Sequence, residues 1–197
     1  ARLCGLDVPE SMLIDFSKYG STFLVRRFDR NGAARIHFAS AMTILGKTDG
    51  ASAADSSSYL ELVSFIKANG AAPKRDLREL WKRIVFNMAV SNTDDHMRNH
   101  GFILKADGWH LSPLYDVNPV PEGDELSLCV NEDDATISLA LALEIAPYCE
   151  ISTKDATAMA ADILKTVREN WSSLASKCGL SRNAQEYMRP AFSLALE

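Results

Sequence analysis

The sequence predicts an α+β fold that is mostly helical and carries a few short β-hairpins. Apolar residues recur at helical spacing over residues 59–69, 76–90 and 152–171. Two other stretches, residues 12–25 and 101–111, consist of short apolar runs separated by turn residues, which is typical of hairpins. A length of 197 residues is enough for one domain with a sizeable core.

The composition is that of an ordinary globular protein, with 47% hydrophobic and 24% charged residues. The net charge of -5 argues against direct binding to nucleic acid, because phosphates attract clustered positive charge. The sequence has no run of about 18 apolar residues, so we expect no membrane partner. The cysteines lack the paired spacing of metal ligands, which predicts buried, reduced thiols in a cytoplasmic protein. They are Cys4, Cys129, Cys149 and Cys178.

Residues 12–16 and 22–25 are predicted to be two strands joined by a turn through residues 17–20. An isolated hairpin is only marginally stable in water. We therefore expect these strands to belong to a larger sheet, and the chain to be part of a longer protein.

Between this hairpin and the first long helix, the sequence predicts a turn at residues 31–32 and a short helix over residues 38–45. Residues 50–58, rich in Ala, Ser and Asp, are predicted to be an exposed linker. A helix is predicted over residues 59–69.

The helix predicted over residues 76–90 carries a continuous apolar stripe, and Pro73 fits its first turn. The stripe consists of Leu77, Leu80, Trp81, Ile84, Val85 and Met88. The solvent face is predicted to consist of Lys74, Arg75, Arg78, Glu79, Lys82 and Arg83. Because this helix is expected to pack against the core, its end is fixed in space. Residues 92–99, which follow it, are therefore expected to lie at a defined position.

A hairpin is predicted next, with strands at residues 101–104 and 109–111 and a turn at residues 105–108 that contains Asp-Gly. This hairpin returns the chain toward its own start. We therefore expect Asp116 to lie beside the loop that carries Asp94.

The rest of the chain is predicted to contain a short strand at residues 126–130 and a helix within residues 137–148. Ser152 is predicted to cap a long core helix. A last helix is predicted from Ser181, kinked or ended by Pro190.

The loop and the hairpin carry the residue types that phosphoryl transfer uses. That reaction needs one carboxylate to orient and deprotonate the attacking hydroxyl, and an amide oxygen with a second carboxylate to hold Mg²⁺ on the nucleotide. Protein kinases place these groups as an Asp, four intervening residues, an Asn, and a later Asp after a hairpin. Asp94, Asn99 and Asp116 have this spacing.

Residues 92–99 and 111–117 resemble the signature of HipA-like serine/threonine kinases, the toxin half of bacterial toxin–antitoxin pairs. Residues 4–9 and 24–30 are similar to the segments that lead that family from its small lobe to its nucleotide hinge. The resemblance is carried by the part of the chain before Pro119.

The resemblance implies a protein-kinase-like architecture in two parts. Residues 1–30 would be the end of a truncated small lobe with its hinge, and residues 31–197 a mostly helical large lobe with a catalytic loop and a β-hairpin. The sequence contains neither a glycine-rich phosphate loop nor a lysine paired with a helix glutamate, which in the family lie before the point where this chain begins. We therefore expect the 197 residues alone to have negligible kinase activity.

The resemblance also implies residue roles. Asp94 would be the catalytic base, and His96 a catalytic-loop residue that orders the loop or faces the phosphates. Two residues would hold Mg²⁺, namely Asn99 and Asp116. The residues implied to bind ATP, the first three through their backbone, are Arg26, Arg27, Phe28, Asn99 and Asp116.

The family usually has Glu at the position of Arg26 and Lys at that of Arg98.

By resemblance, the acceptor would be a Ser or Thr of a protein substrate, such as an aminoacyl-tRNA synthetase or another component of translation. A small DNA-binding antitoxin would be a partner, without direct contact between the kinase and nucleic acid.

Three alternatives stay open. A divalent-metal-dependent hydrolase could use Asp94, His96 and Asp116, with Asp95 and His100 as further ligands, because carboxylate and imidazole suit Zn²⁺, Mn²⁺ or Fe²⁺. The chain could instead be a non-catalytic module that binds a partner. In the third alternative, the polar residues of the loop only cap turns and helix ends.

Overall fold

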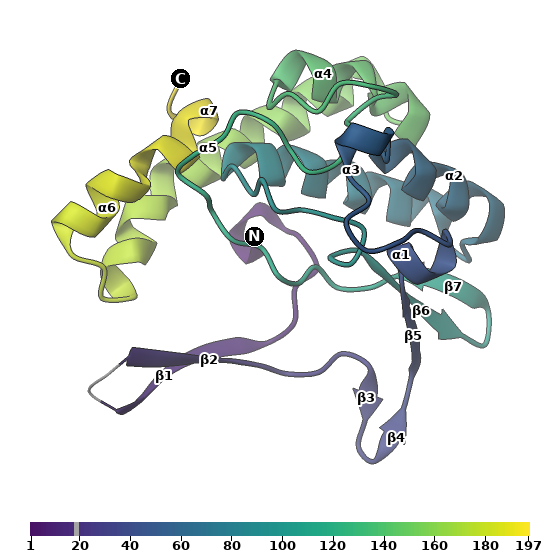
Figure 1. Ribbon diagram of the computed structural model, residues 1–197, viewed down its shortest axis with the longest axis horizontal. Helices are drawn as coiled ribbons and strands as arrows, with labels where there is room; N and C mark the ends of the chain where they lie inside the picture. Colours follow the sequence, from purple (N-terminus) through teal and green to yellow (C-terminus); the bar gives the residue numbers. More distant parts are fainter. Residues whose placement is uncertain (18–19) are drawn as a thin grey trace.

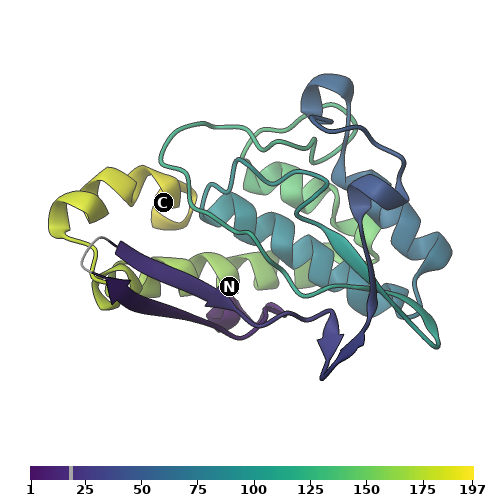
Figure 2. The same ribbon diagram turned by 60° about the horizontal axis from the view of Figure 1, so that its bottom comes forward.

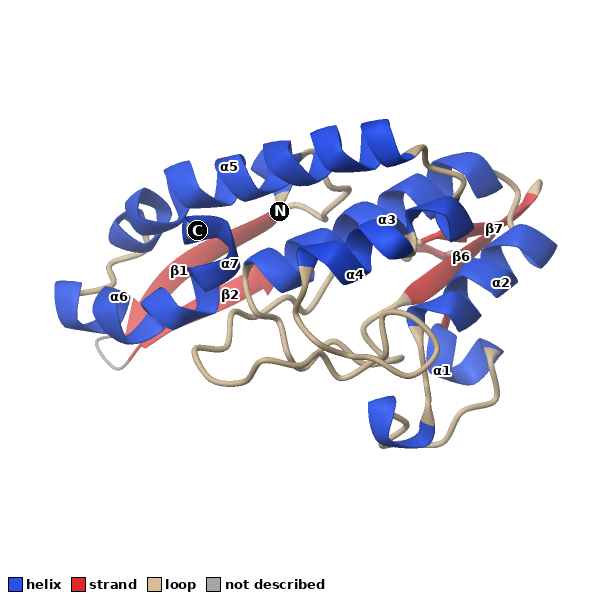
Figure 3. Cartoon of the chain, turned by 90° about the horizontal axis from the view of Figure 1, so that it is seen from above, coloured by secondary structure: helices blue, strands red, loops and turns tan. Residues whose placement is uncertain are grey.

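Helix α3 (Pro73–Ala89) is the central element of the fold, which we describe from a computed structural model that covers residues 1–17 and 20–197. It packs against α2 (Tyr59–Asn69), α4 (Leu139–Glu144), α5 (Thr153–Lys177) and α7 (Ser193–Leu196). Figure 3 shows α3 and α5 running side by side, with the shorter helices around them. The core of the described residues therefore lies between these helices.

The α3 sequence explains its central place. Pro73 occupies the first turn, where its missing N–H is not needed. All six residues of the predicted apolar stripe are fully buried. The predicted solvent face is wrong at Arg83, whose side chain is only 1% exposed. Its guanidinium is stabilised there because Nε donates to Glu79 Oε1 at 3.0 Å and Nη2 to the Ser112 carbonyl at 2.7 Å.

Three small antiparallel sheets lie below the helices in the view of Figure 1. The first contains β1 (Ser11–Ser17) and β2 (Gly20–Val25), and the second β3 (Arg30–Asn31) and β4 (Ala34–Arg35). The third, in the order β5–β6–β7, contains β5 (His37–Ser40), β6 (Gly101–Lys105) and β7 (Gly108–Leu111).

Both predicted hairpins are confirmed. In the first, β1 and β2 pair only with each other within the described residues, as the two-stranded ribbon of Figure 2 shows. The turn predicted through residues 17–20 includes residues 18 and 19, which lie outside the described residues.

The helix predicted over residues 38–45 is only partly right. Its first residues belong to β5, because Phe38 pairs with Ile103 of β6. Helix α1 (Ala41–Ile44) begins after Ser40, whose Oγ accepts a hydrogen bond from Thr43 N at 3.3 Å. Long-range strand pairing therefore overrides the local helical pattern.

The predicted exposed linker over residues 50–58 is only partly right and the predicted strand over residues 126–130 is wrong, for one shared reason. Ser57 of the first segment is completely buried, and its carbonyl accepts a hydrogen bond from Cys129 N at 2.9 Å. Ala53 N donates to the Ser127 carbonyl at 2.7 Å. The two irregular segments satisfy some of each other's backbone groups, so their contacting residues are buried without a regular strand, while residues 54–56 stay exposed.

The C-terminal third follows the predicted order of helices. A single helix over residues 137–148 is replaced by α4 and a 3-10 turn (Ala146–Cys149) that contains Pro147. Ser152 caps α5, since its Oγ accepts from Asp155 N at 3.1 Å. The last helix is divided into α6 (Arg182–Met188) and α7 by a 3-10 turn that includes Pro190.

None of the helices that the structure describes is both long enough and apolar enough to span a bilayer.

Candidate active site

The predicted catalytic loop begins where α3 ends, and two asparagines fix its first residues. Asn92 N donates to the Asn87 carbonyl at 2.8 Å, and Asn92 Nδ2 donates to Asn87 Oδ1 at 3.2 Å. Both side chains are buried. Asn92 Oδ1 also accepts from the backbone N–H of Asn118 at 3.3 Å. The end of α3 thus holds both the loop and the segment that follows the β6–β7 hairpin.

Asn99 joins the two candidate aspartates. Its Nδ2 donates to the backbone oxygen of Asp94 and to that of Asp116, both at 3.3 Å. Asn99 is only 3% exposed, so this bridge is shielded from water. The predicted return of the chain to the loop is confirmed. The structure therefore brings Asp94, Asn99 and Asp116 together, although Asp94 and Asp116 are 22 positions apart in the sequence.

Asp94 is notable for its exposed side chain and Asp116 for its backbone conformation. The Asp94 side chain is 78% exposed, and its Oδ1 lies 3.9 Å from His96 Nε2. Asp116 has a φ of 55°, a left-handed conformation that costs energy for a residue with a side chain. Its Oδ1 accepts a hydrogen bond from Asn118 Nδ2 at 3.2 Å. Such backbone strain is concentrated at functional sites, where the surrounding structure maintains it.

Asn99 and Asp116 offer the kind of oxygen ligand that Mg²⁺ prefers. The Asn99 nitrogen is occupied by its two carbonyl partners, while Oδ1 has no hydrogen-bond partner among the described residues. That oxygen is free to meet a ligand. The donor set therefore fits a magnesium-bound nucleotide.

Sequence reasoning missed the buried group that supports this loop. Asp95 turns away from its neighbour Asp94 into the core, where it is 1% exposed. Its Oδ2 accepts hydrogen bonds from Tyr59 Oη at 2.6 Å, Asn87 Nδ2 at 2.6 Å and His100 Nε2 at 2.9 Å. The one available signal was Asn87, a polar residue placed at helical spacing on the apolar face of α3. We call these four residues the Asp95 cluster.

The Asp95 cluster affects the chemistry of its members. Burial, followed by the negative charge of Asp95, raises the pKa of the Tyr59 hydroxyl well above its usual value. Tyr59 therefore stays protonated and donates its hydrogen bond throughout the physiological pH range. Tyr59 and His100 also pack edge to face, with ring centroids 5.6 Å apart.

This arrangement weighs against the metal-dependent hydrolase. Two of its proposed ligands, Asp95 and His100, point into the core and bind each other. Over residues 1–17 and 20–197, no group of three or more His, Cys, Asp or Glu side chains could hold a metal ion. The geometry leaves Asp94 beside His96, without the carboxylate and imidazole set that a hydrolytic metal would need.

The predicted nucleotide hinge is connected to the site through aromatic contacts. The Phe28 ring lies 5.6 Å from the ring of Tyr115, the residue before Asp116, and 5.6 Å from that of Phe38. The backbone N–H of Arg26 already donates to the Glu10 carbonyl at 2.8 Å, so this donor is not available to a base. Among the described residues, the backbone N–H groups of Arg27 and Phe28 have no hydrogen-bond partner, so these two hinge donors are available to a base.

Two arginines at or beside this hinge form ion pairs with Asp29. Arg27 and Arg30 each contact Asp29 Oδ2 at 2.6 Å. The hydrogen bonds from Arg27 lower the pKa of Asp29 to about 2. The two side chains are therefore directed at Asp29 rather than at the candidate aspartates.

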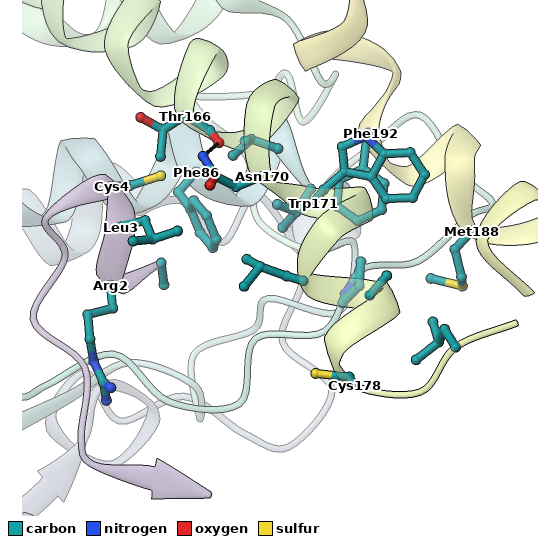
Figure 4. A pocket seen from close by; sticks show the side chains of 17 residues that line it. Arg2, Leu3, Cys4, Phe86, Thr166, Asn170, Trp171, Cys178, Met188 and Phe192 are labelled. Atoms are coloured by element: carbon teal, nitrogen blue, oxygen red, sulfur yellow. Dashed lines mark hydrogen bonds between the residues drawn. The ribbon is translucent and has the colours of Figure 1, made fainter. Parts of the chain in front are cut away.

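A separate apolar cavity of about 540 Å³ lies between the N-terminal segment and α5. Figure 4 shows Phe86, Trp171 and Phe192 around it, with Cys4 and Cys178 at its edges. It contains none of the predicted site residues, so it has no part in the geometry described above.

Solved structures share this fold. The chain superposes over its full length on a chain of the Shewanella oneidensis toxin–antitoxin complex of HipA, HipB and operator DNA, with a TM-score of 0.76 and 16% identity, covering 52% of that chain. It also matches the Helicobacter pylori proinflammatory kinase CtkA, with a TM-score of 0.59 and 13% identity over 98% of this chain and 78% of the other. The fold is thus the kinase-like α+β fold of these proteins.

The family follows from the sequence comparisons. The model of the HipA-like C-terminal domain matches residues 1–171, and the chain belongs to this family. A Haemophilus influenzae protein named "Putative kinase" is 32% identical over 132 residues, which are 60% of this chain and 38% of the relative. "Putative kinase Y4dM" of Sinorhizobium fredii is 24% identical over 189 residues, 87% of this chain and 46% of the relative. The chain spans less than half the length of these two relatives.

Proposed function

We propose that this chain contains the catalytic large lobe of a HipA-like protein serine/threonine kinase, which transfers the γ-phosphate of ATP to a protein hydroxyl. The observation that carries the proposal is the Asn99 bridge, which holds the backbones of Asp94 and Asp116 on either side of one buried amide. An exposed carboxylate, an amide oxygen and a second carboxylate are the groups that this reaction uses.

In this mechanism the exposed carboxylate of Asp94 orients the acceptor hydroxyl and accepts its proton. The hydroxyl oxygen bonds to the γ-phosphorus while the bond from that phosphorus to the β,γ-bridging oxygen breaks, which leaves ADP. Asn99 Oδ1 and the Asp116 carboxylate would hold Mg²⁺, which supplies positive charge that neutralises the phosphate oxygens. His96, whose Nε2 lies 3.9 Å from Asp94 Oδ1, would order the loop or face the phosphates.

We also propose that residues 1–30 are the end of a small lobe and that residues 31–197 form the large lobe. The two-stranded β1–β2 sheet and the 38% and 46% coverage of the relatives support this division. The phosphate loop and its lysine would then be supplied by a part of the protein that precedes the hinge. Activity assays therefore belong in the full-length protein.

The partners follow by analogy with the Shewanella complex, in which HipA is assembled with HipB and operator DNA. We propose that a small DNA-binding antitoxin binds this protein and that the acceptor is a Ser or Thr of a translation component. A cytoplasmic location would give access to ATP and keep thiols reduced, in line with three buried free cysteines among the described residues.

The test is calorimetric titration of ATP into the full-length protein, with and without Mg²⁺, followed by phosphoryl transfer from radiolabelled ATP. We expect Mg²⁺-dependent binding, and we expect Asp94→Asn to abolish transfer while nucleotide binding persists. Unchanged transfer by Asp94→Asn would exclude this residue as the base. If the full-length protein does not bind ATP, the non-catalytic, partner-binding alternative takes its place.

A further inference from the structure

A polar cavity of about 350 Å³ opens beside the candidate base. The loop of residues 48–52 forms one wall, and the catalytic-loop residues Asp94, His96 and Arg98 form the other. Met42, Met97 and Ser127 complete the lining. The exposed Asp94 carboxylate therefore lines a half-open cavity.

This cavity is distinct from the proposed metal side of the site. Neither Asn99 nor Asp116 lines it, although Asn99 is bonded to the backbone of both aspartates. A nucleotide held by Asn99 and Asp116 would thus reach Asp94 from one side. The cavity leaves the other side of Asp94 open to the group that gives up its proton.

An ion pair joins the two walls. Arg98 Nη1 lies 2.7 Å from Asp49 Oδ1, and the two side chains are 49% and 70% exposed. Together with Asp94, this pair supplies three charged groups to the cavity. Because Asp49 balances the charge of Arg98, the carboxylate of Asp94 leaves the lining with a net negative charge.

The wall of residues 48–52 is anchored at both ends. Lys47 Nζ lies 2.8 Å from Glu61 Oε2 on α2 and donates to Ser57 Oγ at 3.2 Å. At the other end, Ala53 N donates to the Ser127 carbonyl. Gly50, with a φ of 90°, gives the turn between them a conformation that disfavours other residues. The position of Asp49 is therefore set by the fold.

Building on the proposed kinase function, we propose that this cavity binds the acceptor segment of the protein substrate, with its hydroxyl at Asp94 and a neighbouring residue against the Asp49–Arg98 pair. The pair then sets which charge is accepted beside the phosphorylated Ser or Thr. Removing Arg98 would leave two carboxylates facing the substrate, which favours a flanking Lys or Arg. Removing Asp49 would leave a free guanidinium, which favours a flanking Asp or Glu.

The experiment is a positional-scanning library of Ser/Thr peptides, phosphorylated by the full-length protein with radiolabelled ATP. Relative kcat/KM for Lys-flanked over Glu-flanked peptides is compared for wild type, Arg98→Gln and Asp49→Asn. We expect the ratio to rise about threefold to fivefold in Arg98→Gln and to fall by a similar factor in Asp49→Asn, as for one charge contact near a surface. High salt should reduce both shifts.

Controls separate a local effect from general damage. Lys165→Gln removes an exposed charge of α5 that is 4.0 Å from Glu169, outside the residues that line the cavity, and should leave the ratio unchanged. The double variant Asp49→Asn, Arg98→Gln should return toward wild-type selectivity, which a mere loss of stability would not produce. ATP affinity should stay within about twofold in all variants, since these side chains lie on the acceptor side.

Shifts in the same direction for both single variants, or no shift at all, would overturn the cavity assignment while ATP binding and transfer stand. Absence of transfer in the wild-type protein would instead overturn the proposed function and this inference with it.

Discussion

The hydroxyl of Tyr59, the first residue of α2, donates a 2.6 Å hydrogen bond to the carboxylate of Asp95 in the catalytic loop. Both residues are buried, and the bond connects two segments that are 36 residues apart. Asp95 is adjacent to the candidate base Asp94. A hydrogen bond inside the core therefore helps to hold the segment that carries the exposed candidate base.

Tyr59→Phe should destabilise the protein by about 1–3 kcal/mol, because a buried carboxylate loses one of its charge-assisted hydrogen bonds. It should lower kcat more than it weakens ATP binding, since the loop loses part of its support. Urea unfolding and steady-state kinetics measure the two effects. Tyr187→Phe is the matched control, because this tyrosine is 63% exposed and should change stability by less than about 0.5 kcal/mol. Equal effects of the two substitutions would contradict a special role for Tyr59.

Stability should decline at alkaline pH, in part because of Tyr59. Its pKa is raised in the folded state relative to the usual 10.0, so the folded protein keeps a proton that the unfolded chain releases. The contribution is complete below pH 10 and is lost as the pH rises toward the folded pKa. Urea unfolding at a series of pH values should show a shallower alkaline decline in Tyr59→Phe than in wild type. An identical decline would mean that Tyr59 ionises as an exposed tyrosine does.

Asp116→Asn should separate charge from backbone conformation. Asparagine tolerates the left-handed conformation that Asp116 adopts, so stability should change by less than about 0.5 kcal/mol. If the carboxylate holds Mg²⁺, Mg²⁺-dependent ATP affinity should fall by at least about tenfold, or 1.4 kcal/mol. Calorimetry with and without Mg²⁺ is the measurement. Asp124→Asn, at an exposed position in a nearby loop, is the charge-matched control. Unchanged Mg²⁺ dependence in Asp116→Asn would remove this residue from the metal site.

Only Cys178 of the four cysteines should react quickly with a thiol reagent in the native protein. It is exposed, whereas the other three are buried. Burial also raises their pKa values, to about 12 for Cys149, which lowers the thiolate fraction that reacts. Titration with Ellman's reagent should give one fast thiol in buffer and four in denaturant. Cys178→Ser should abolish the fast phase, and a second fast thiol in that variant would contradict the buried assignment.

The elements around the site were predictable where local patterns decide them. The stripe of α3 and the Asp-Gly turn before β7 are local signals, and both were interpreted correctly. The proximity of Asp116 to Asp94 could also be predicted, because the β6–β7 hairpin returns the chain to the loop from which β6 starts.

The errors arise where distant segments decide the structure. Phe38 looked helical but pairs with β6, 65 positions away at Ile103. Arg83 looked like a solvent-facing residue but is buried because Glu79 and the Ser112 carbonyl receive its guanidinium. Asp95 was indistinguishable from Asp94 by residue type. Only the fold shows that one carboxylate faces the core and the other the cavity, since the partners of Asp95 come from α2, from α3 and from the end of its own loop.

The β1–β2 ribbon has a practical consequence for handling this chain. Phe16 and Phe23 are 70% and 65% exposed, and Met12 is 58% exposed. Leu13 faces Phe23 across the pair while Met12 faces Leu24, so apolar side chains cover both surfaces of the ribbon. Such a ribbon with free edges is a template for aggregation. Lysine substitutions at Phe16 and Phe23 would act as gatekeepers that reduce aggregation of this chain.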